Sequence, residues 1–255
     1  MDETVFKARI ISGLNEVSPD AWNRVANPRS LPFDPFLTWE FLEALESSGA
    51  ARPETGWSPC HVLVEGPGDE ILAAMPMYAK THSQGEFVFD HSWADAYERA
   101  GGNYFPKLLS AVPFSPVTGR RFLVPPGPDQ ARLENALLSA AIQIGVQNDF
   151  SSLHINFVQP DFAEQMSETG LLIRTDQQFH WNNADYKSFD EFLAALSSAK
   201  RKNLRKERAK AQAGLTFKHL TGDQIQEAHW DAFFEFYMNT GARKWGYPYL
   251  NRDTF

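Results

Sequence analysis

The sequence contains a single cysteine, Cys60. This excludes an intramolecular disulfide and a cysteine-rich zinc site, and one unpaired thiol suits a reducing compartment. The longest apolar stretch, near residues 136–146, is far shorter than the ~20 residues that a membrane-spanning helix needs. The N-terminus, Met-Asp-Glu, lacks the basic start and apolar run of a signal peptide. We therefore expect a cytoplasmic protein with no membrane span.

The sequence also lacks the common ligand-binding motifs. Its seven histidines are scattered and form no HExxH pattern, so we predict no metal site. Neither GxGxxG nor GxxxxGK[ST] occurs. The loop Ser115–Pro128 precedes a helix, whose N-terminus could bind phosphate, but Pro125, Pro126 and Pro128 remove backbone donors. We interpret this loop as a structural connection.

With 255 residues, of which 43% are hydrophobic, the chain can form one or two domains with a substantial core. Its apolar spacing predicts an α/β protein. The expected strands are Val5–Ile11, His61–Glu65, Ile71–Tyr78, Phe87–Asp90, Leu108–Pro113 and Ser152–Val158. The expected helices in the same part are Pro19–Ala26, Thr38–Ser47 and Asp129–Gly145.

The last hundred residues are more helical in pattern. Ser188 and Glu191 form a capping box ahead of one helix, and Thr221 and Gln224 form another. Gly241 is expected to end the last of these helices. Between the helices, Leu215–Leu220 alternates as a strand does.

Charge is concentrated in one short segment. Lys200–Lys210 holds seven cations and one anion, whereas the whole chain has a net charge of −8. An acidic chain with one compact basic helix indicates a local anion site and argues against a broad nucleic-acid surface. Arginine side chains can bind phosphate through two parallel hydrogen bonds. The alternative is a helix face whose charges are simply solvated.

Three further segments could contribute to a site. Arg243–Tyr249 places two cations beside three aromatic residues, and it could seat a ligand or simply form a packed turn. Phe89–Tyr97 holds two carboxylates and a histidine among aromatic residues, where Asp95 could act as a general base or the cluster could be structural. The segment His180–Asn183 could line a pocket or form a turn before a helix.

Several of these segments together resemble the FemAB-like N-acyltransferases of bacteria. They run from about residue 35 to residue 255, and each segment alone is weak evidence. They are Phe87–Tyr97, Tyr104–Leu109, Ala111–Gly119, Ser152–His154, Gln178–Asn182, Ser197–Arg208 and Arg243–Leu250.

The resemblance implies a GNAT-like acyltransferase fold, with mixed, mostly antiparallel sheets in two tandem domains. We expect a first domain over 1–160 and the start of a second over 161–255, which the chain's end would leave incomplete. The expected activity is transfer of an acyl or aminoacyl group to an amine. The amine would belong to a cell-wall precursor or another small molecule. The donor would be an acyl-CoA or an aminoacyl-tRNA, and whether this chain is active alone stays open.

The resemblance and the charge pattern together give a set of expected site residues. We expect a phosphate of the donor or acceptor at Lys200, Arg201, Lys202, Asn203 and Arg205. We expect Lys244, Trp245 and Tyr249 to shape the pocket, and Asp95 to act as the base. Two alternatives stay open: a fragment that recognises the precursor without turnover, and a module that binds tRNA or other nucleic acid through the basic helix.

Overall fold

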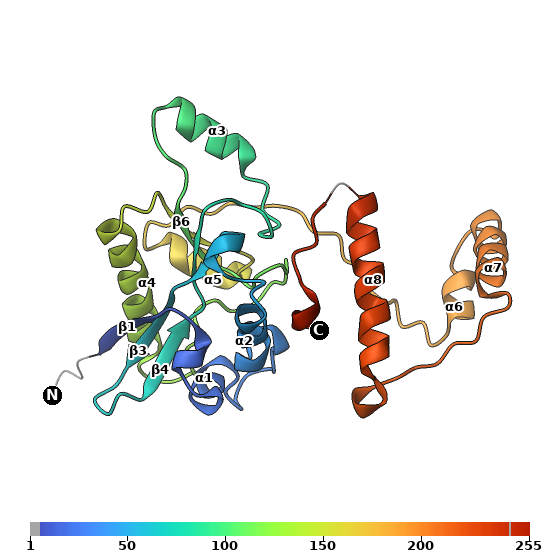
Figure 1. The fold of residues 1–255 in the computed structure, drawn as a ribbon, viewed down its shortest axis with the longest axis horizontal. Coiled ribbons are helices and arrows are strands. Elements are labelled where there is room, and N and C mark those ends of the chain that lie inside the picture. The colour runs from blue at the N-terminus through green and yellow to red at the C-terminus, as the bar shows by residue number, and fades with distance from the viewer. Residues whose placement is uncertain (1–5, 245) are drawn as a thin grey trace. The chain divides into compact units, whose positions relative to one another are not determined.

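The computed structural model describes residues 6–244 and 246–255, which fall into two compact units (Figure 1). The main unit comprises residues 1–171 and 231–255, and the second unit is Leu172–Trp230. Helix α8 (Glu227–Arg243) begins in the second unit and continues into the main unit. The predicted division at residue 160 into two GNAT-like domains stays a prediction.

The described part of the main unit contains two small sheets. Their strands are β1 (Lys7–Ile11), β2 (Trp57–Pro59), β3 (His61–Glu65), β4 (Ile71–Met75), β5 (Tyr78–Lys80), β6 (Lys107–Ser110) and β7 (Leu153–Ile155). The first sheet has the order β1-β3-β4 and is antiparallel throughout. The second has the order β2-β5-β6-β7, in which β6 and β7 pair in parallel. The expected mixed, mostly antiparallel α/β architecture is therefore confirmed.

The chain crosses between the two sheets at two neighbouring points. Cys60 separates β2 from β3, and Pro76 and Met77 separate β4 from β5. The Cys60 N–H donates to the Met77 carbonyl at 2.9 Å, so the two crossings are hydrogen-bonded to each other. Residues on either side of this junction belong to different sheets.

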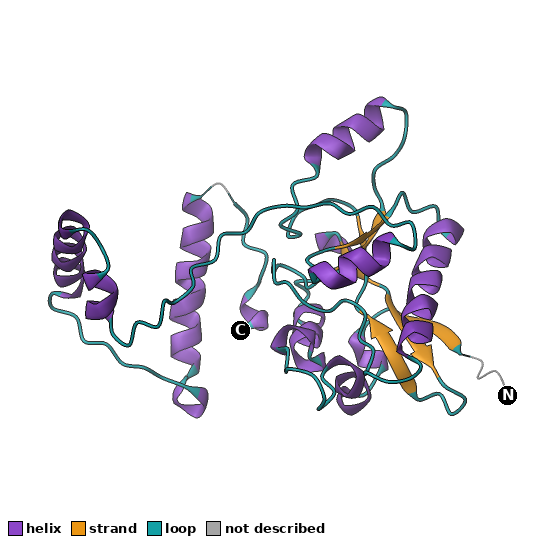
Figure 2. Ribbon diagram, turned by 180° about the vertical axis from the view of Figure 1, so that it is seen from behind, coloured by secondary structure: helices purple, strands orange, loops and turns teal. Residues whose placement is uncertain are grey.

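Helices cover both faces of the first sheet (Figures 1 and 2). The α-helices of the main unit before α8 are α1 (Pro19–Ala26), α2 (Trp39–Ser47), α3 (His91–Arg99), α4 (Gln130–Gln147) and α5 (Pro160–Ser167). Val62 and Val64 pack with Leu137 of α4, whereas Leu63 packs with Trp22 of α1. Successive side chains of β3 point to opposite faces, which is why one strand serves both cores.

Short 3₁₀ turns connect many of these elements. They are η1 (Leu14–Glu16), η2 (Pro35–Leu37), η3 (Pro53–Thr55), η4 (Gly222–Gln224) and η5 (Arg252–Thr254). Helix α3 differs from the other main-unit helices before α8 because none of its residues is buried. Figure 1 shows it standing away from the two sheets.

The second unit is built on two helices, α6 (Phe189–Ala194) and α7 (Ser198–Gln212). Ser188 caps α6, since its Oγ accepts the Glu191 N–H at 3.2 Å. The predicted strand Leu215–Leu220 is wrong: this segment is exposed and irregular. A strand needs a neighbouring strand to satisfy its backbone, and the second unit contains none among its described residues.

Two other sequence predictions are also wrong. Phe87–Asp90 is not a strand, because the chain turns at Phe87 (φ 56°) and brings the Asp90 side chain into the interior. Gly241 does not end α8, which continues to Arg243. A Cβ at Gly241 would lie 2.8 Å from Cγ of Pro248, so this glycine permits a close approach of the chain that follows the helix.

Candidate functional site

A cluster of buried charged side chains lies under the segment Ser83–Asp90 of the main unit. At its centre is Lys107 on β6, whose side chain is fully buried. Its Nζ donates to Glu86 Oε2 at 2.9 Å, to Asp90 Oδ2 at 2.6 Å and to Ser83 Oγ at 3.1 Å. The Tyr104 hydroxyl also donates to Asp90 Oδ2, at 2.8 Å. Lys107 therefore ties the whole segment to the second sheet.

A second buried lysine, Lys80 on β5, belongs to the same cluster. Its Nζ lies 3.7 Å from the centroid of the Trp57 ring and donates to the Gln84 carbonyl at 3.4 Å. Burial lowers the pKa of Lys80 to about 7, an effect that the Glu86 carboxylate opposes and the Lys107 charge reinforces. The amine of Lys80 can therefore gain or lose a proton near neutral pH.

The two carboxylates of the cluster differ in their protonation chemistry. Burial raises the pKa of Glu86, and the Lys107 charge only partly offsets this. Burial alone would also raise the pKa of Asp90, but hydrogen bonds from Lys107 and Ser83 outweigh this effect and lower the pKa to about 2. Glu86 Oε1 and Asp90 Oδ1 are buried without a hydrogen-bond partner among the described residues. The cluster thus holds one firmly ionised carboxylate and one that retains a proton more readily.

Tyr249 contacts the Ser83–Asp90 segment through the ring of Phe87. Its ring stacks on Phe114, with centroids 5.3 Å apart and planes 13° apart, and meets Phe87 edge-on at 6.2 Å. The Tyr237 hydroxyl accepts the Tyr249 N–H at 2.9 Å, which fixes the backbone there. Tyr249 is 38% exposed, so it can both support the segment and face a ligand.

Of the other predicted residues of the main unit, Asp95 and Lys244 lie at the surface. Asp95 is exposed on α3, and its role as a base stays a prediction. Lys244 is exposed just after α8, while Trp245 lies outside the described residues. Sequence reasoning singled out Asp95, whereas Asp90, five residues earlier, is the carboxylate that the fold buries and pairs with a lysine.

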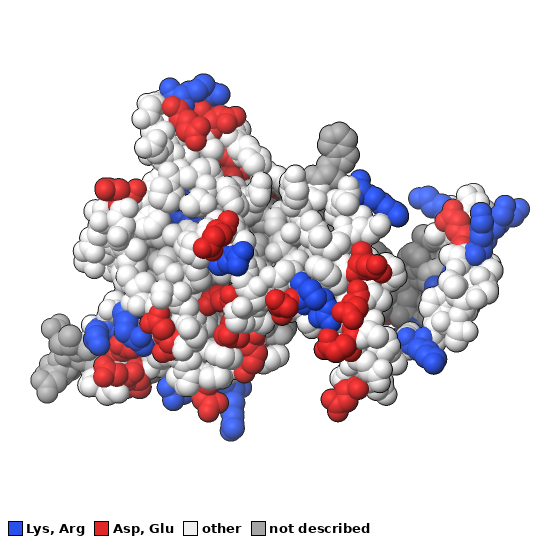
Figure 3. Space-filling model, viewed as in Figure 1, with Lys and Arg blue, Asp and Glu red and all other residues white. Residues whose placement is uncertain are grey.

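Helix α7 in the second unit holds the five predicted phosphate-binding residues. Lys200, Lys202, Asn203 and Arg205 are exposed, and Arg201 is half-buried. Arg205 lies 3.5 Å from the Asp190 carboxylate, an exposed ion pair that holds α7 beside α6 only weakly. In the described part of the chain, we find no ion pair for Lys200 or Lys202. Figure 3 shows Lys and Arg side chains gathered over α7.

An aromatic cleft of about 610 Å³ lies between α6 and the segment that precedes it in the second unit. Its lining residues are Trp181, Asn183, Tyr186, Lys187, Ser188, Phe189 and Phe192. The hypothesis that His180–Asn183 lines a pocket is confirmed for Trp181 and Asn183. The Arg208 guanidinium of α7 lies 4.1 Å from the Phe189 ring centroid, so the basic helix contacts a residue that lines the cleft.

The described residues contain no group of three or more His, Cys, Asp or Glu side chains placed to hold a metal ion. In residues 6–244 and 246–255, no helix combines the length and apolar character needed to cross a membrane. Cys60 is half-buried, and burial raises its pKa to about 12, so its thiolate is scarce at neutral pH.

Comparison with curated proteins and comparison with solved structures each give no significant match. A family model does match, and it covers residues 13–255, which include the whole second unit and all of the main unit after residue 12. The model is that of the FemAB-like proteins, described by peptidoglycan biosynthesis or recognition. Because the match covers nearly the whole sequence, the chain belongs to the FemAB-like family of peptidoglycan biosynthesis and recognition proteins.

Proposed function

We propose that this protein is an N-acyltransferase that transfers an acyl or aminoacyl group to an amine of a cell-wall precursor. The observation that carries the proposal is the family match over residues 13–255. The amine would attack the thioester or ester carbonyl of the donor directly. Holding the two reactants together would supply much of the rate, and backbone N–H groups would stabilise the oxyanion. We place the reaction in the cytoplasm.

The charge on α7 supports a site for a phosphorylated substrate. Lys200, Arg201, Lys202 and Arg205 lie within two turns of one helix, and Asn203 adds an exposed amide. Like charges three or four residues apart on a helix repel by ~0.2–0.5 kcal/mol per pair. A multivalent anion such as pyrophosphate would offset that repulsion, and the guanidinium groups would bind it bidentately.

The aromatic cleft beside α7 supports a donor that carries a flat ring near its phosphates. Three aromatic rings of the cleft are placed for stacking, those of Trp181, Tyr186 and Phe192. The Arg208 guanidinium contacts the ring of Phe189, which also lines the cleft. Both donor classes under consideration, acyl-CoA and aminoacyl-tRNA, carry an adenine ring and phosphate. The cleft therefore fits either donor, and experiment must choose between them.

In the main unit, we propose that Tyr249 and Lys244, together with Trp245, shape a substrate pocket. Asp95 is our candidate base, because a carboxylate exposed on α3 is free to meet an amine from solvent. The base would take the proton that the attacking amine must lose before or during transfer.

The substrate class can be tested by thermal unfolding against acetyl-CoA, a longer acyl-CoA, a UDP-linked muropeptide and a charged tRNA. A ligand at 100 times its dissociation constant stabilises the folded state by ~2.7 kcal/mol, which raises the unfolding midpoint visibly. We expect the shift to disappear in the Lys200→Ala/Arg201→Ala variant. A control, Lys206→Ala/Lys210→Ala, removes the same charge from α7 and should keep most of the shift. Equal losses in both variants would contradict a local phosphate site.

One observation favours a second candidate, since the family description includes recognition as well as biosynthesis. A recognition protein would bind the muropeptide as tightly with or without a donor, and no transfer product would form. A third reading, general nucleic-acid binding through α7, would show an affinity for unrelated RNA that falls steeply with salt.

A further inference from the structure

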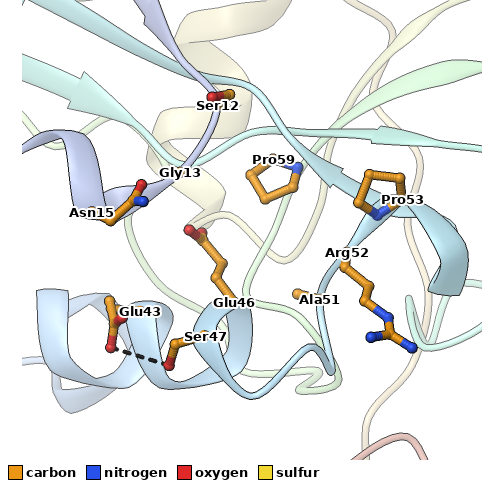
Figure 4. A pocket seen from close by; sticks show the side chains of 10 residues that line it. All are labelled: Ser12, Gly13, Asn15, Glu43, Glu46, Ser47, Ala51, Arg52, Pro53 and Pro59. Carbon is orange, nitrogen blue, oxygen red and sulfur yellow. Dashed lines mark hydrogen bonds between the residues drawn. The ribbon is translucent and has the colours of Figure 1, made fainter.

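The central carboxylate of the main-unit cavity in Figure 4 is already satisfied. This cavity, of about 260 Å³, lies between the end of β1 and helix α2. Glu46 has a partner at each carboxylate oxygen, since His61 Nε2 lies 2.7 Å from Oε1 and the Leu14 N–H donates to Oε2 at 2.8 Å. Among the described residues, lysines without an ion pair gather instead on α7 of the second unit (Figure 3).

One side of α7 rests against its surroundings. Arg201 and Leu204 are half-buried, and the Arg208 guanidinium lies 4.1 Å from the centroid of the Phe189 ring of α6. In a helix with 3.6 residues per turn, these three positions lie within about 60° of one another. This is the side of α7 that faces α6, and the opposite side is left to solvent.

Three lysines line that opposite side. Lys202, Lys206 and Lys210 are exposed and follow one another at four-residue intervals, so their side chains share one face. Lys206 lies about 170° around the helix from the centre of the covered side, and the row spans about 12 Å along the helix axis. In the part of the chain that the structure describes, none of the three has an ion pair. The row is longer than one pyrophosphate group, and Lys206 and Lys210 lie outside the phosphate site proposed above.

Exposed apolar side chains lie at the end of the same helix. The Leu215 N–H donates to the carbonyl of Gln212, the last residue of α7, at 3.1 Å. Leu215 and Phe217 are 61% and 63% exposed. Among the described residues of the second unit, Leu193 alone is buried. The unit therefore provides no core that could bury Leu215 and Phe217.

We propose that the lysine face of α7 binds the surface of a bilayer that contains anionic lipids, and that Leu215 and Phe217 enter its interfacial region. The negative potential of such a surface attracts each lysine near it. The apolar side chains add the second contribution that stable membrane association requires. A flat array of head groups matches a straight row of cations. Such binding is peripheral and needs neither donor nor acceptor, so the inference goes beyond the proposed transfer reaction.

The apolar residues favour a bilayer over a nucleic acid. A nucleic acid would neutralise the lysines through its phosphates, and Phe217 could stack on a base, but Leu215 would find no hydrocarbon there. The second unit holds ten lysines and arginines against seven carboxylates, whereas the whole chain has a net charge of −8. The charge distribution therefore turns this unit, rather than the main unit, toward an anionic surface.

The test is co-sedimentation of the full chain with lipid vesicles. One set contains equal parts of phosphatidylglycerol and phosphatidylcholine, and the other contains phosphatidylcholine alone. We expect binding to the anionic set that weakens as salt is raised, because salt screens the attraction. Binding to the neutral set should be about tenfold weaker or less detectable still, since the lysines then meet no negative potential.

Two variants and one control locate the binding. Lys206→Ala/Lys210→Ala should weaken binding to the anionic vesicles about tenfold or more. Arg24→Ala/Arg29→Ala removes the same charge from exposed sites of the main unit and should leave binding unchanged. Leu215→Ser/Phe217→Ser keeps every charge and should also weaken binding, because the apolar contribution is lost. All these side chains are exposed, so the variants should fold, and circular dichroism checks this.

Three results would overturn the inference: no binding to either vesicle set, equal binding to both, or unchanged binding in the lysine or the apolar variant. A protein that ignores vesicles, and whose lysine variant loses RNA binding or self-association, would overturn it as well, because the lysine face would then serve that partner. Since Lys206 and Lys210 lie outside the proposed phosphate site, vesicle binding and acyl transfer can fail independently.

Discussion

Lys80 shows how one buried side chain makes the stability of the fold depend on pH. Its amine lies over the Trp57 ring inside the main unit, where burial disfavours the charged form. The charged amine still gains something from the ring, since a cation over an aromatic face is attracted to it. The lowered pKa indicates that burial outweighs this gain.

The stability of the protein should consequently rise from pH 7 to about pH 9. The pKa of Lys80 is about 7 in the folded state and near 10.5 when the chain unfolds. Between these values the unfolded state binds more protons at this amine, which raises the free energy of unfolding with pH, and below pH 7 the full cost of the charge is present. Above about pH 9 the Cys60 thiol, whose pKa burial raises from 9.0 to about 12, opposes this rise. Urea unfolding at several pH values measures this.

The variant Lys80→Met should flatten that rise, because no titrating amine remains at this position. Lys218→Met, at an exposed site of the second unit, is the control and should leave the pH dependence as it is. A Lys80→Met protein with the same rise in stability would show that another group is responsible.

At the scale of one element, the segment Ser83–Asp90 is held in place by Lys107 rather than by a regular ladder of backbone hydrogen bonds. Three side chains of this segment converge on one ammonium group. The segment in turn supports Tyr249 through Phe87 and precedes α3, the helix with Asp95. Its position therefore sets the surroundings of two predicted site residues.

The variant Lys107→Met should destabilise the main unit by about 3–5 kcal/mol, because two buried carboxylates lose their cation. Chemical denaturation followed by tryptophan fluorescence measures the loss. Adding Glu86→Gln and Asp90→Asn should restore part of the stability, since the two carboxylates that lost their cation are then neutral. A loss below about 1 kcal/mol for the single variant would mean that Lys107 does not hold the segment.

Local sequence signals predicted the helices better than the strands. Helix α1 has the predicted bounds, and α2 begins directly after Thr38, whose Oγ caps it. These signals are local, since a cap or an apolar stripe acts within one helix. The segments Phe87–Asp90 and Leu215–Leu220 are rich in apolar and aromatic residues, as true strands are. Whether they pair depends on a neighbouring strand, which local sequence does not specify.

At the scale of the whole molecule, the family could be identified from short segments spread over the chain, whereas the buried cluster could not be predicted. Lys80, Glu86, Asp90 and Lys107 come from two strands and the loop between them. Each looks like an ordinary surface charge in the sequence, and only the sheet topology brings them together. The Glu46–His61 pair escaped prediction for the same reason, because α2 and β3 meet only in the folded chain.

The basic helix could be predicted from the sequence because its charges are clustered in one short segment. The aromatic cleft beside it was only partly visible, since Trp181 precedes α6 while Arg208 lies on α7. Together these two features make the second unit the expected place for the donor.

The central claim is that this FemAB-like protein forms a new amide bond on a cell-wall precursor. The most direct measurement is mass spectrometry of a UDP-linked muropeptide after incubation with the protein and each candidate donor, acyl-CoA or aminoacyl-tRNA. Our account predicts a mass increase equal to one acyl or aminoacyl group with one donor class, strongly reduced in the Lys200→Ala/Arg201→Ala variant. A muropeptide that binds but stays unmodified with every donor would contradict transfer and favour recognition alone.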